Sequence, residues 1–302
     1  MEFLHNNPVL FSQAINLSVA KSGLRPEIIE KDYYVTMLLL LLSKQIPHLV
    51  FKGGTSLSKC YKAINRFSED IDLSMSSLLS QGQRRKVKES IIQTCNMLNL
   101  TILNLDNIRS RRDYNRYEIG YNPVQSSGQP IQPTLIIETS YTTLSFPVLN
   151  LDVHSYIGDI IADEAPEYLN RFNLAPFKME VQGLDRTLAD KIYAVCDYYL
   201  QGKPNGHSRH LYDIYKLLQL VKLDKSFKEL VQEVRKSRMV SPICPSAQPD
   251  IDIDELLKKI IEENIYRNDY ETITERLLGE PLSYDNAIGA LIIISESGIF
   301  AS

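Results

Sequence analysis

The sequence predicts a chain of the α+β or α/β class with two parts, an N-terminal part that mixes helices with a sheet and an all-helical C-terminal part. Short apolar runs bounded by turn residues recur between residues 49 and 154, which is typical of strands. After Pro166 the apolar residues have helical spacing instead. The length of 302 residues suits two domains of about 100–200 residues each. We therefore expect one domain over residues 1–165 and a second, helical domain over residues 166–302.

Two helices are expected before the first strand. Residues 8–21 carry apolar side chains at helical spacing, and Gly23 ends this helix. Pro26 suits the first turn of a second helix over residues 26–44, which Pro47 ends. The leucines at 38–42 make that helix apolar all round, which indicates deep burial.

The remaining elements follow from apolar spacing and turn residues. Strands are predicted at residues 49–51, 70–73, 101–105, 117–121, 134–140 and 149–154, with helices at 55–63 and 83–98. Residues 123–133 are expected to form a loop. In the C-terminal part, helices are predicted at residues 184–200, 209–220, 224–238, 253–263, 269–278 and 284–295.

Composition and charge exclude several classes of protein. The 33 basic and 37 acidic residues give a net charge of −4, which argues against a wholly basic nucleic-acid coat but allows a local basic groove. The longest apolar run, at residues 37–42, is far shorter than the roughly 20 residues of a membrane span. The four cysteines are scattered, and the opening residues do not resemble a signal peptide. We expect a cytoplasmic protein without a zinc knuckle or a disulfide framework.

Asp70 and Asp72 carry the clearest chemical signal. On a strand, side chains two residues apart point to the same face, while the residues between them face the core. Two carboxylates this close repel each other unless a cation lies between them, and Mg²⁺ or Mn²⁺ prefers such oxygen ligands. A third carboxylate from a neighbouring strand would complete a metal site. Glu138, an isolated acid in an apolar strand, is the candidate, and Asp152 is its competitor.

Gly53 and Gly54 stand between a predicted strand and a predicted helix. A glycine pair at such a place lets backbone N–H groups approach a phosphate closely, and Ser56 can offer a hydroxyl to the same phosphates. The alternative is a tight turn in which Thr55 caps the helix. No G-K-[ST] sequence follows, so this is not a Walker motif.

Together these features resemble a known family. The order of strand, glycine pair, helix and Asp-x-Asp is similar to the nucleotidyltransferase superfamily related to DNA polymerase β. Residues 52–57 (KGGTSL) and 66–73 (RFSEDIDL) resemble the AbiEii/AbiGii-type toxin family more closely. Residues 30–33 (EKDY), 188–194 (LADKIYA) and 209–214 (RHLYDI) also resemble motifs of that family, in the right order. In the last motif His210 stands where the family often has an aspartate, which leaves the role of that position open.

The resemblance implies both a fold and an activity. The fold would be a polymerase-β-like nucleotidyltransferase core with a mixed sheet, preceded by helices and followed by an all-helical C-terminal domain. The activity would be Mg²⁺- or Mn²⁺-dependent transfer of a nucleoside monophosphate from an NTP to an RNA acceptor such as the 3′ end of tRNA. The chain would be the toxin of a bacterial toxin–antitoxin or abortive-infection system. Its antitoxin is often a DNA-binding repressor in this family and need not bind the toxin directly.

The same resemblance implies roles for individual residues. Asp70, Asp72 and Glu138 would hold the metal, and Lys191 would neutralise charge on the phosphates. Asp213 would orient Lys191 or the base and sugar. The nucleotide-binding set would comprise Lys52, Gly53, Gly54, Thr55, Ser56, Arg66, Ser68 and Lys191.

Each role has a plainer alternative. Lys191 could lie on a solvated helix face, and Arg209 and Asp213, four apart on a helix, could form an ordinary surface ion pair. Arg66 could pair with Glu69 instead of a phosphate. Ser68 could cap a strand end or be modified as a regulatory device.

Three basic clusters bear on the acceptor. Basic and aromatic side chains together suit RNA, although such runs are more often solvated faces. The clusters are Arg84, Arg85, Lys86 and Lys88; Arg109, Arg111, Arg112 and Arg116 with Tyr114 and Tyr117; and Arg235, Lys236 and Arg238. The acceptor could instead be a protein or a small molecule such as an antibiotic, which an enclosed apolar pocket would favour. A non-catalytic nucleotide-binding module is the remaining alternative.

Overall fold

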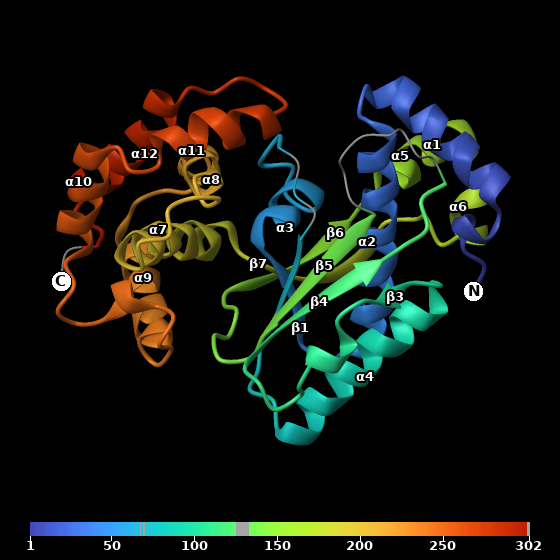
Figure 1. The fold of residues 1–302 in the computed structure, drawn as a ribbon, viewed down its shortest axis with the longest axis horizontal. Helices are drawn as coiled ribbons and strands as arrows, with labels where there is room; N and C mark the ends of the chain where they lie inside the picture. The colour runs from blue at the N-terminus through green and yellow to red at the C-terminus, as the bar shows by residue number, and fades with distance from the viewer. Residues whose placement is uncertain (67, 69, 125–132, 301–302) are drawn as a thin grey trace. The chain divides into compact units, whose positions relative to one another are not determined.

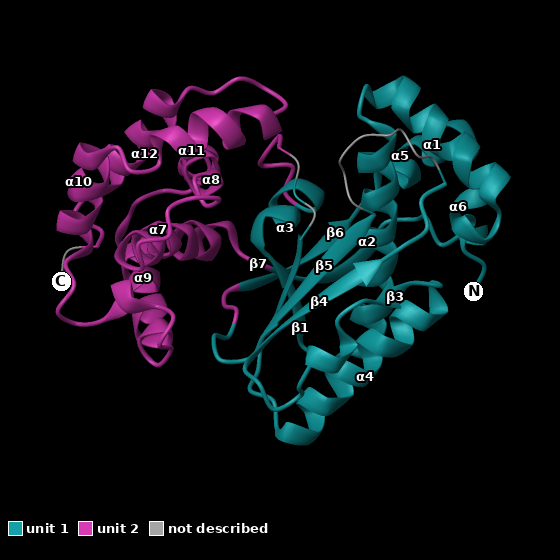
Figure 2. Cartoon of the chain, viewed as in Figure 1, with its two compact units in different colours: residues 1–60, 68–144, 148–181 teal, residues 61–67, 145–147, 182–302 magenta. Residues whose placement is uncertain are grey.

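The computed structural model describes residues 1–66, 68, 70–124 and 133–300, which form two compact units (Figure 2). Unit 1 comprises residues 1–60, 68–144 and 148–181. Unit 2 comprises residues 61–67, 145–147 and 182–302. The chain therefore leaves unit 1 after residue 60 and returns to it at Ser68. The predicted domain boundary after residue 165 stays a prediction.

Unit 1 is built on a seven-stranded sheet of order β3-β4-β5-β2-β1-β7-β6 (Figure 1). β2 runs antiparallel to β1 and parallel to β5, while β4 runs antiparallel to both β3 and β5. β1 is parallel to β7. The sheet is therefore mixed, as the sequence predicts. The strands are β1 (Leu49–Lys52), β2 (Asp70–Met75), β3 (Thr101–Ile102), β4 (Tyr114–Gly120), β5 (Thr134–Ser140), β6 (Val148–Val153) and β7 (Phe177–Gln182).

The two central strands β2 and β5 place alternate residues on opposite faces of the sheet. Ile71 and Leu73 are buried, and so are Leu135 and Ile137, whereas the residues between them are half-buried. One face thus belongs to the hydrophobic core. The opposite face is available for polar side chains at every second position.

Local sequence signals account for the helices of unit 1. Asn7 caps α1, and Gly23 ends it in the left-handed conformation at φ 70°. Residues 38–42 of α2 are all buried, in agreement with their apolar character. A capping box joins Ser80 to Gln83 at the start of α4. The helices are η1 (Leu4–Asn6), α1 (Pro8–Ser22), α2 (Pro26–Gln45), α3 (Gly53–Lys59), α4 (Gln81–Met97), η2 (Leu105–Asn107), α5 (Tyr156–Glu164) and α6 (Glu167–Arg171).

Unit 2 is helical, as predicted for the C-terminal part. α7 packs against α8, α9 and α10, and α12 packs against α8 and α10. The elements are α7 (Leu184–Leu200), α8 (Arg209–Leu218), α9 (Lys225–Met239), η3 (Pro245–Ala247), α10 (Ile253–Glu263), α11 (Arg267–Asp269), η4 (Tyr270–Thr274), η5 (Glu275–Leu277) and α12 (Tyr284–Glu296). Among the described residues, no helix combines the length and the apolar character needed to cross a membrane.

Several predicted elements differ from the observed ones. Residues 269–278 form a short α-turn, a π-turn and a 3₁₀ turn instead of one helix. There the Asp269 carboxylate accepts hydrogen bonds from the backbone N–H groups of Gly206 and Ser208, which fixes the segment on tertiary partners. The strand predicted at 101–105 has only two residues. Most of the loop predicted at 123–133 lies outside the described residues, as do Phe67 and Glu69.

Candidate active site

Gly53 opens α3 in a backbone conformation that an ordinary side chain could not adopt. Its φ is +78°, in the left-handed region that favours glycine. A β-carbon at this position would also lie 1.8 Å from Oδ2 of Asp72. The glycine therefore brings the start of α3 against the Asp72 carboxylate. Thr55 is not the helix cap considered above, because the helix already begins at Gly53.

The acids of β2 share one face of the sheet. Asp70 and Asp72 are half-buried and alternate with buried residues, so the expected same-face arrangement is confirmed. Asp72 lies in register opposite Lys52 of β1 on one side and opposite Glu138 of β5 on the other. Glu138 in turn lies opposite Arg116 of β4. Paired residues in neighbouring strands point to the same face.

These four residues, which we call the charged row, run across four adjacent strands as Lys52, Asp72, Glu138 and Arg116. Two carboxylates stand in the middle with a cation at each end. Arg116 Nε lies 3.7 Å from Glu138 Oε1. The like charges of Asp72 and Glu138 are thus partly balanced within the sheet itself.

Asp152, the competitor of Glu138, lies elsewhere on the sheet. It is on β6, which the strand order separates from β2 by β1 and β7. Its carboxylate is 3.1 Å from Lys178 Nζ at an exposed position. The structure therefore brings Glu138, and not Asp152, beside Asp72. The catalytic role of Glu138 stays a prediction.

The donors on this face fit a hard divalent cation by their chemistry. Asp70, Asp72 and Glu138 offer carboxylate oxygens from adjacent strands, the ligand type that Mg²⁺ and Mn²⁺ prefer. Within the described part of the chain, no three His, Cys, Asp or Glu side chains are drawn together into a compact metal-binding group. The three carboxylates are therefore suitable in ligand type and in the face of the sheet that they share.

Three hydroxyl residues lie near the acids, and one of them, Thr55, ties α3 to β2. The Thr55 hydroxyl donates to the backbone carbonyl of Asp70 over 2.6 Å and lies 2.9 Å from the Ser68 hydroxyl. The Ser56 hydroxyl donates to the carbonyl of Gly53 over 2.8 Å. These bonds hold the backbone in place around the acids. Nucleotide contacts by Thr55, Ser56 and Ser68 stay predictions.

Unit 2 contains a buried ion cluster centred on Asp213. Arg66 donates to both carboxylate oxygens, with Nε 2.7 Å from Oδ1 and Nη2 2.8 Å from Oδ2. Lys191 Nζ lies 2.6 Å from Oδ2. The Asp213 side chain is 0% exposed. Burial alone would favour the neutral acid, but the two cations outweigh it and lower the pKa of Asp213.

This Asp213 cluster, comprising Arg66, Lys191 and Asp213, corrects two of the plainer alternatives. Asp213 is not a surface residue, and its partners shown here are Arg66 and Lys191. Lys191 is 8% exposed and does not lie on a solvated face. The Arg66 guanidinium binds a carboxylate 147 positions away. No local sequence signal could have revealed that partner. The predicted contact of Arg66 with a phosphate stays a prediction, and so does the alternative pair with Glu69, which lies outside the described residues.

The segment around Arg66 is held on unit 2 by further contacts. The backbone N–H of Asn65 donates to the Tyr212 hydroxyl over 3.0 Å, and the backbone N–H of Gly279 donates to the Asn65 carbonyl over 2.8 Å. Arg66 also forms a β-bridge with Leu278. Since the chain re-enters unit 1 at Ser68, these contacts anchor the peptide that leads into the acidic strand.

His210 follows Arg209 in the motif where the family often has an aspartate. Burial lowers its pKa well below the ordinary value, with nearby Lys191 and Arg209 adding to that effect. It is therefore a neutral imidazole at physiological pH. Its Nδ1 is buried and has no hydrogen-bond partner among the described residues.

The three basic clusters differ in their surroundings. Arg235 donates to the backbone carbonyls of Ala247, Gln248 and Ile251, and Arg238 binds Asp190 and Asp197. The arginines of that cluster therefore hold segments of unit 2 together. The other two clusters are joined to each other in unit 1, because Arg84 Nη1 lies 2.7 Å from Asp113 Oδ1 and Lys88 donates to the carbonyl of Ile108 over 3.0 Å.

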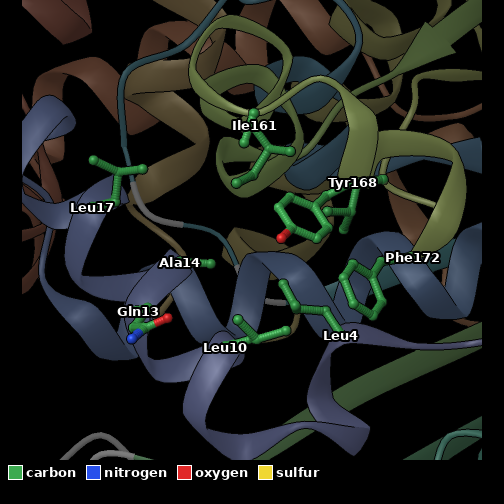
Figure 3. Close-up of a pocket in the computed structure, with 10 residues that line it drawn as sticks. Leu4, Leu10, Gln13, Ala14, Leu17, Ile161, Tyr168 and Phe172 are labelled. Atoms are coloured by element: carbon green, nitrogen blue, oxygen red, sulfur yellow. The ribbon is translucent and has the colours of Figure 1, made fainter.

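An apolar pocket of about 150 Å³ lies apart from the acids in unit 1 (Figure 3). It is lined by residues of η1, α1, α5, α6 and the chain that follows α6, such as Leu10, Ile161, Tyr168 and Phe172. None of its lining residues is charged or belongs to β2 or β5. It therefore offers no group for the chemistry predicted for Asp70 and Asp72.

Comparison with known proteins decides the family. The sequence model described as nucleotidyl transferase AbiEii toxin, type IV toxin–antitoxin system, matches residues 38–290. The chain belongs to the AbiEii family. The resemblance seen in the sequence motifs is thereby confirmed. This AbiEii chain is a nucleotidyltransferase toxin of a type IV system, which implies an NTP substrate and an antitoxin partner.

The fold has a counterpart among solved structures. It is similar to MenT4, a nucleotidyltransferase toxin from Mycobacterium tuberculosis H37Rv, with a TM-score of 0.50 and 15% sequence identity. The alignment covers 96% of this chain and 88% of the other. At this identity the likeness concerns the fold alone, and it confirms the predicted fold class for the AbiEii chain. No curated protein matches the sequence.

Proposed function

We propose that the AbiEii chain transfers a nucleoside monophosphate from an NTP to an RNA acceptor, with Mg²⁺ or Mn²⁺ held by Asp70, Asp72 and Glu138. The observation that carries this proposal is the register of the charged row, which sets Glu138 directly opposite Asp72. Asp70 lies on the same face of β2. A divalent ion there would neutralise phosphate charge and polarise the reacting phosphoryl oxygen.

The protein groups around the acids have separate tasks in this proposal. Gly53 leaves room for the Asp72 carboxylate, and Thr55 fixes the backbone of Asp70. Glu138, on a neighbouring strand, would help to take the proton of the attacking hydroxyl. Lys52, at the end of the charged row, would contact the anionic nucleotide. Positioning and electrostatic stabilisation then supply most of the catalysis.

The Asp213 cluster supports the proposed role of Lys191. The buried Asp213 carboxylate fixes the position of the Lys191 ammonium group. Phosphate groups of the NTP are anions, and Lys191 would bind them as a point cation. Arg66 acts as a positioning residue, because its two hydrogen bonds orient the carboxylate that holds Lys191.

RNA is the acceptor that we propose, with the 3′ end of tRNA to be tested first. Exposed arginines lie in the loop before β4 and on β4 itself. β4 pairs with β5, the strand that carries Glu138. A small-molecule acceptor is the alternative: the apolar pocket is smaller than the roughly 300–1,000 Å³ of usual ligand sites, while a second pocket of about 290 Å³ is lined by Lys178 and Glu180. Family membership indicates an enzyme, so a purely nucleotide-binding module is not retained.

We further propose that the antitoxin is a DNA-binding repressor that need not touch the toxin.

The test is a transfer assay with the purified protein. It is incubated with Mg²⁺, total tRNA and each of the four α-³²P-labelled NTPs, and the Asp72→Asn variant is the control. We expect label on RNA with at least one NTP and none with the variant. Label on protein instead would overturn the RNA acceptor and would make Ser68 the first site to map. No label on any acceptor, with every NTP, would overturn the proposal.

A further inference from the structure

The start of β4 combines an exposed aromatic ring with cations beside the acids. Tyr114 is 46% exposed and stands in register opposite Ser140 of β5. Arg116, two residues later, points to the same face and is opposite Glu138. Glu138 is the diagonal neighbour of Tyr114 across the two strands, within reach of an aromatic side chain.

Tyr114 is therefore an exposed aromatic residue on the face of the sheet that carries Glu138. The exposed part of its side chain includes a flat apolar ring. An exposed aromatic ring on a strand can serve as a platform for stacking.

The basic residues around this platform come from two separate parts of the sequence. Residues 84–88 and 109–116 contain eight basic residues and one acid, Asp113, in a chain whose net charge is −4. The Arg84–Asp113 ion pair and the bond from Lys88 to Ile108 bring the start of α4 next to the loop before β4. Arg111 and Arg112 of that loop are exposed. Positive charge thus gathers at the end of β4 where Tyr114 lies.

We propose that Tyr114 and Arg116 form the acceptor subsite, on which the unpaired 3′-terminal base of an RNA stacks while Arg111 and Arg112 contact its backbone phosphates. This inference rests on the proposed function, because it names where that RNA lies relative to Glu138. Single-stranded RNA ends are recognised through stacking on aromatic rings and guanidinium planes together with phosphate contacts. A protein hydroxyl as acceptor would need neither the open ring nor the local excess of cations.

The subsite also places the attacking group in a chemically useful position. A base on Tyr114 would bring the 3′-terminal ribose toward the carboxylate of Glu138, the diagonal neighbour of Tyr114. The ribose hydroxyl attacks the α-phosphate, its proton passes to Glu138, and pyrophosphate leaves with the electrons of the broken P–O bond. Atoms and charge balance with the NTP and the RNA as the only reactants.

The first experiment separates binding from chemistry. Fluorescein-labelled tRNA is titrated with the Asp72→Asn protein, alone and combined with Tyr114→Phe or Tyr114→Ala, and binding is followed by anisotropy. We expect Tyr114→Ala to weaken binding about tenfold or more, as for the loss of one stacked base, and Tyr114→Phe to retain most of it. Tyr156→Ala, at a tyrosine 40% exposed on α5, is the matched control and should bind like the parent.

The second experiment measures KM and kcat in the active protein. Tyr114→Ala should raise the KM for tRNA while the Kd for the NTP with Mg²⁺ stays at its original value. Arg111→Gln should flatten the salt dependence of tRNA binding, whereas Lys225→Gln, at an exposed lysine of unit 2, should not.

Specific outcomes overturn the inference. Equal losses of tRNA binding in Tyr114→Phe and Tyr114→Ala would show that the hydroxyl, and not the ring, makes the contact. If the wild type transfers label to RNA and Tyr114→Ala has an unchanged KM for tRNA, the proposed subsite is overturned and the proposed function is kept. If the wild type labels no RNA while Asp72→Asn still binds tRNA through Tyr114, the proposed function fails and the subsite stands.

Discussion

The Asp72 carboxylate lies against the α-carbon of Gly53, so closely that a β-carbon there would be 1.8 Å from Oδ2. Gly53 precedes β2 by 17 positions, and the contact joins the glycine motif to the acidic motif. The glycine pair was expected to let a backbone approach a phosphate. The structure shows that Gly53 also makes room for the carboxylate itself.

Replacement of Gly53 by alanine should therefore abolish most activity. The methyl group would displace Asp72, and the left-handed φ adds strain of about 1–2 kcal/mol. We expect a loss of kcat/KM of at least a hundredfold in the transfer assay. Gly23→Ala is the matched control, because Gly23 has a similar φ of +70° with nothing near its β-carbon position. Gly23→Ala should lower the free energy of unfolding without lowering kcat/KM. A loss of activity comparable to that of Gly53→Ala would contradict the argument.

Removal of Arg66 should weaken both the fold and nucleotide binding. Arg66→Met leaves Asp213 buried with one cation instead of two, and breaking a buried pair costs about 3–5 kcal/mol. We expect the free energy of unfolding in urea to fall by about 3 kcal/mol and the KM for the NTP to rise at least tenfold. Lys259→Met removes an exposed ion pair of the same unit, in which Nζ lies 2.7 Å from Glu255, and should change neither quantity appreciably. An unchanged KM in folded Arg66→Met would refute the positioning role.

His5 should make unit 1 sensitive to mild acid. Burial lowers the pKa of His5 to about 4, and its Nε2 has no hydrogen-bond partner among the described residues. The unfolded chain binds the proton near pH 6.5, so stability is complete above that pH and decreases as the pH falls toward 4. We expect the Tm to fall between pH 7 and pH 5, and His5→Phe, which keeps a ring beside Phe3, to reduce that fall.

The control for His5 is His154→Asn. It removes a partly exposed imidazole of the same unit, whose Nδ1 lies 3.0 Å from Asp159 Oδ1, and is measured beside His5→Phe. His207 and His210 also have lowered pKa values, and part of the slope will remain in His5→Phe. A pH dependence identical to that of the wild type would show that His5 is not held neutral.

Arg238 should be needed for stability and not for RNA. It joins two acids of α7, with Nη1 3.0 Å from Asp190 and Nη2 2.7 Å from Asp197. Asp197 also accepts bonds from the backbone and the hydroxyl of Ser246, so the network fixes η3 on α7. We expect Arg238→Met to lower the free energy of unfolding by about 3 kcal/mol. The tRNA affinity of the folded variant should equal that of the wild type, and a tenfold loss would assign this cluster to RNA.

Much of the fold follows from local patterns. The helices at the N-terminus, the acidic strand and the helical C-terminal part were predicted because propensity, caps and apolar spacing agree in those segments. β7 was missed, although Phe177, Met179 and Val181 alternate with polar residues as a strand requires. The broken helix at 269–278 was not predicted, because its partners at Gly206 and Ser208 are distant in sequence.

The candidate site was predictable only in part. The spacing of Asp70 and Asp72 defines their common face without any tertiary information. The choice between Glu138 and Asp152 depends on strand order, which two isolated acids in apolar strands do not reveal. The partner of Arg66 could not be predicted from the sequence. The fold decides which carboxylate lies beside a buried arginine, and here it is Asp213, 147 positions away.

The division of each unit into three stretches of chain limits how this protein can be dissected. A fragment that stops at residue 181 would contain every strand residue of the charged row, yet it would still carry Arg66 without the carboxylate that neutralises it. A fragment that begins at residue 182 would keep Asp213 and Lys191 but lose Arg66. Coexpression of two separate polypeptides would have to rebuild that ion cluster by association. For the same reason, a random insertion within residues 61–67 should disrupt folding more than an insertion of equal length in an ordinary surface loop.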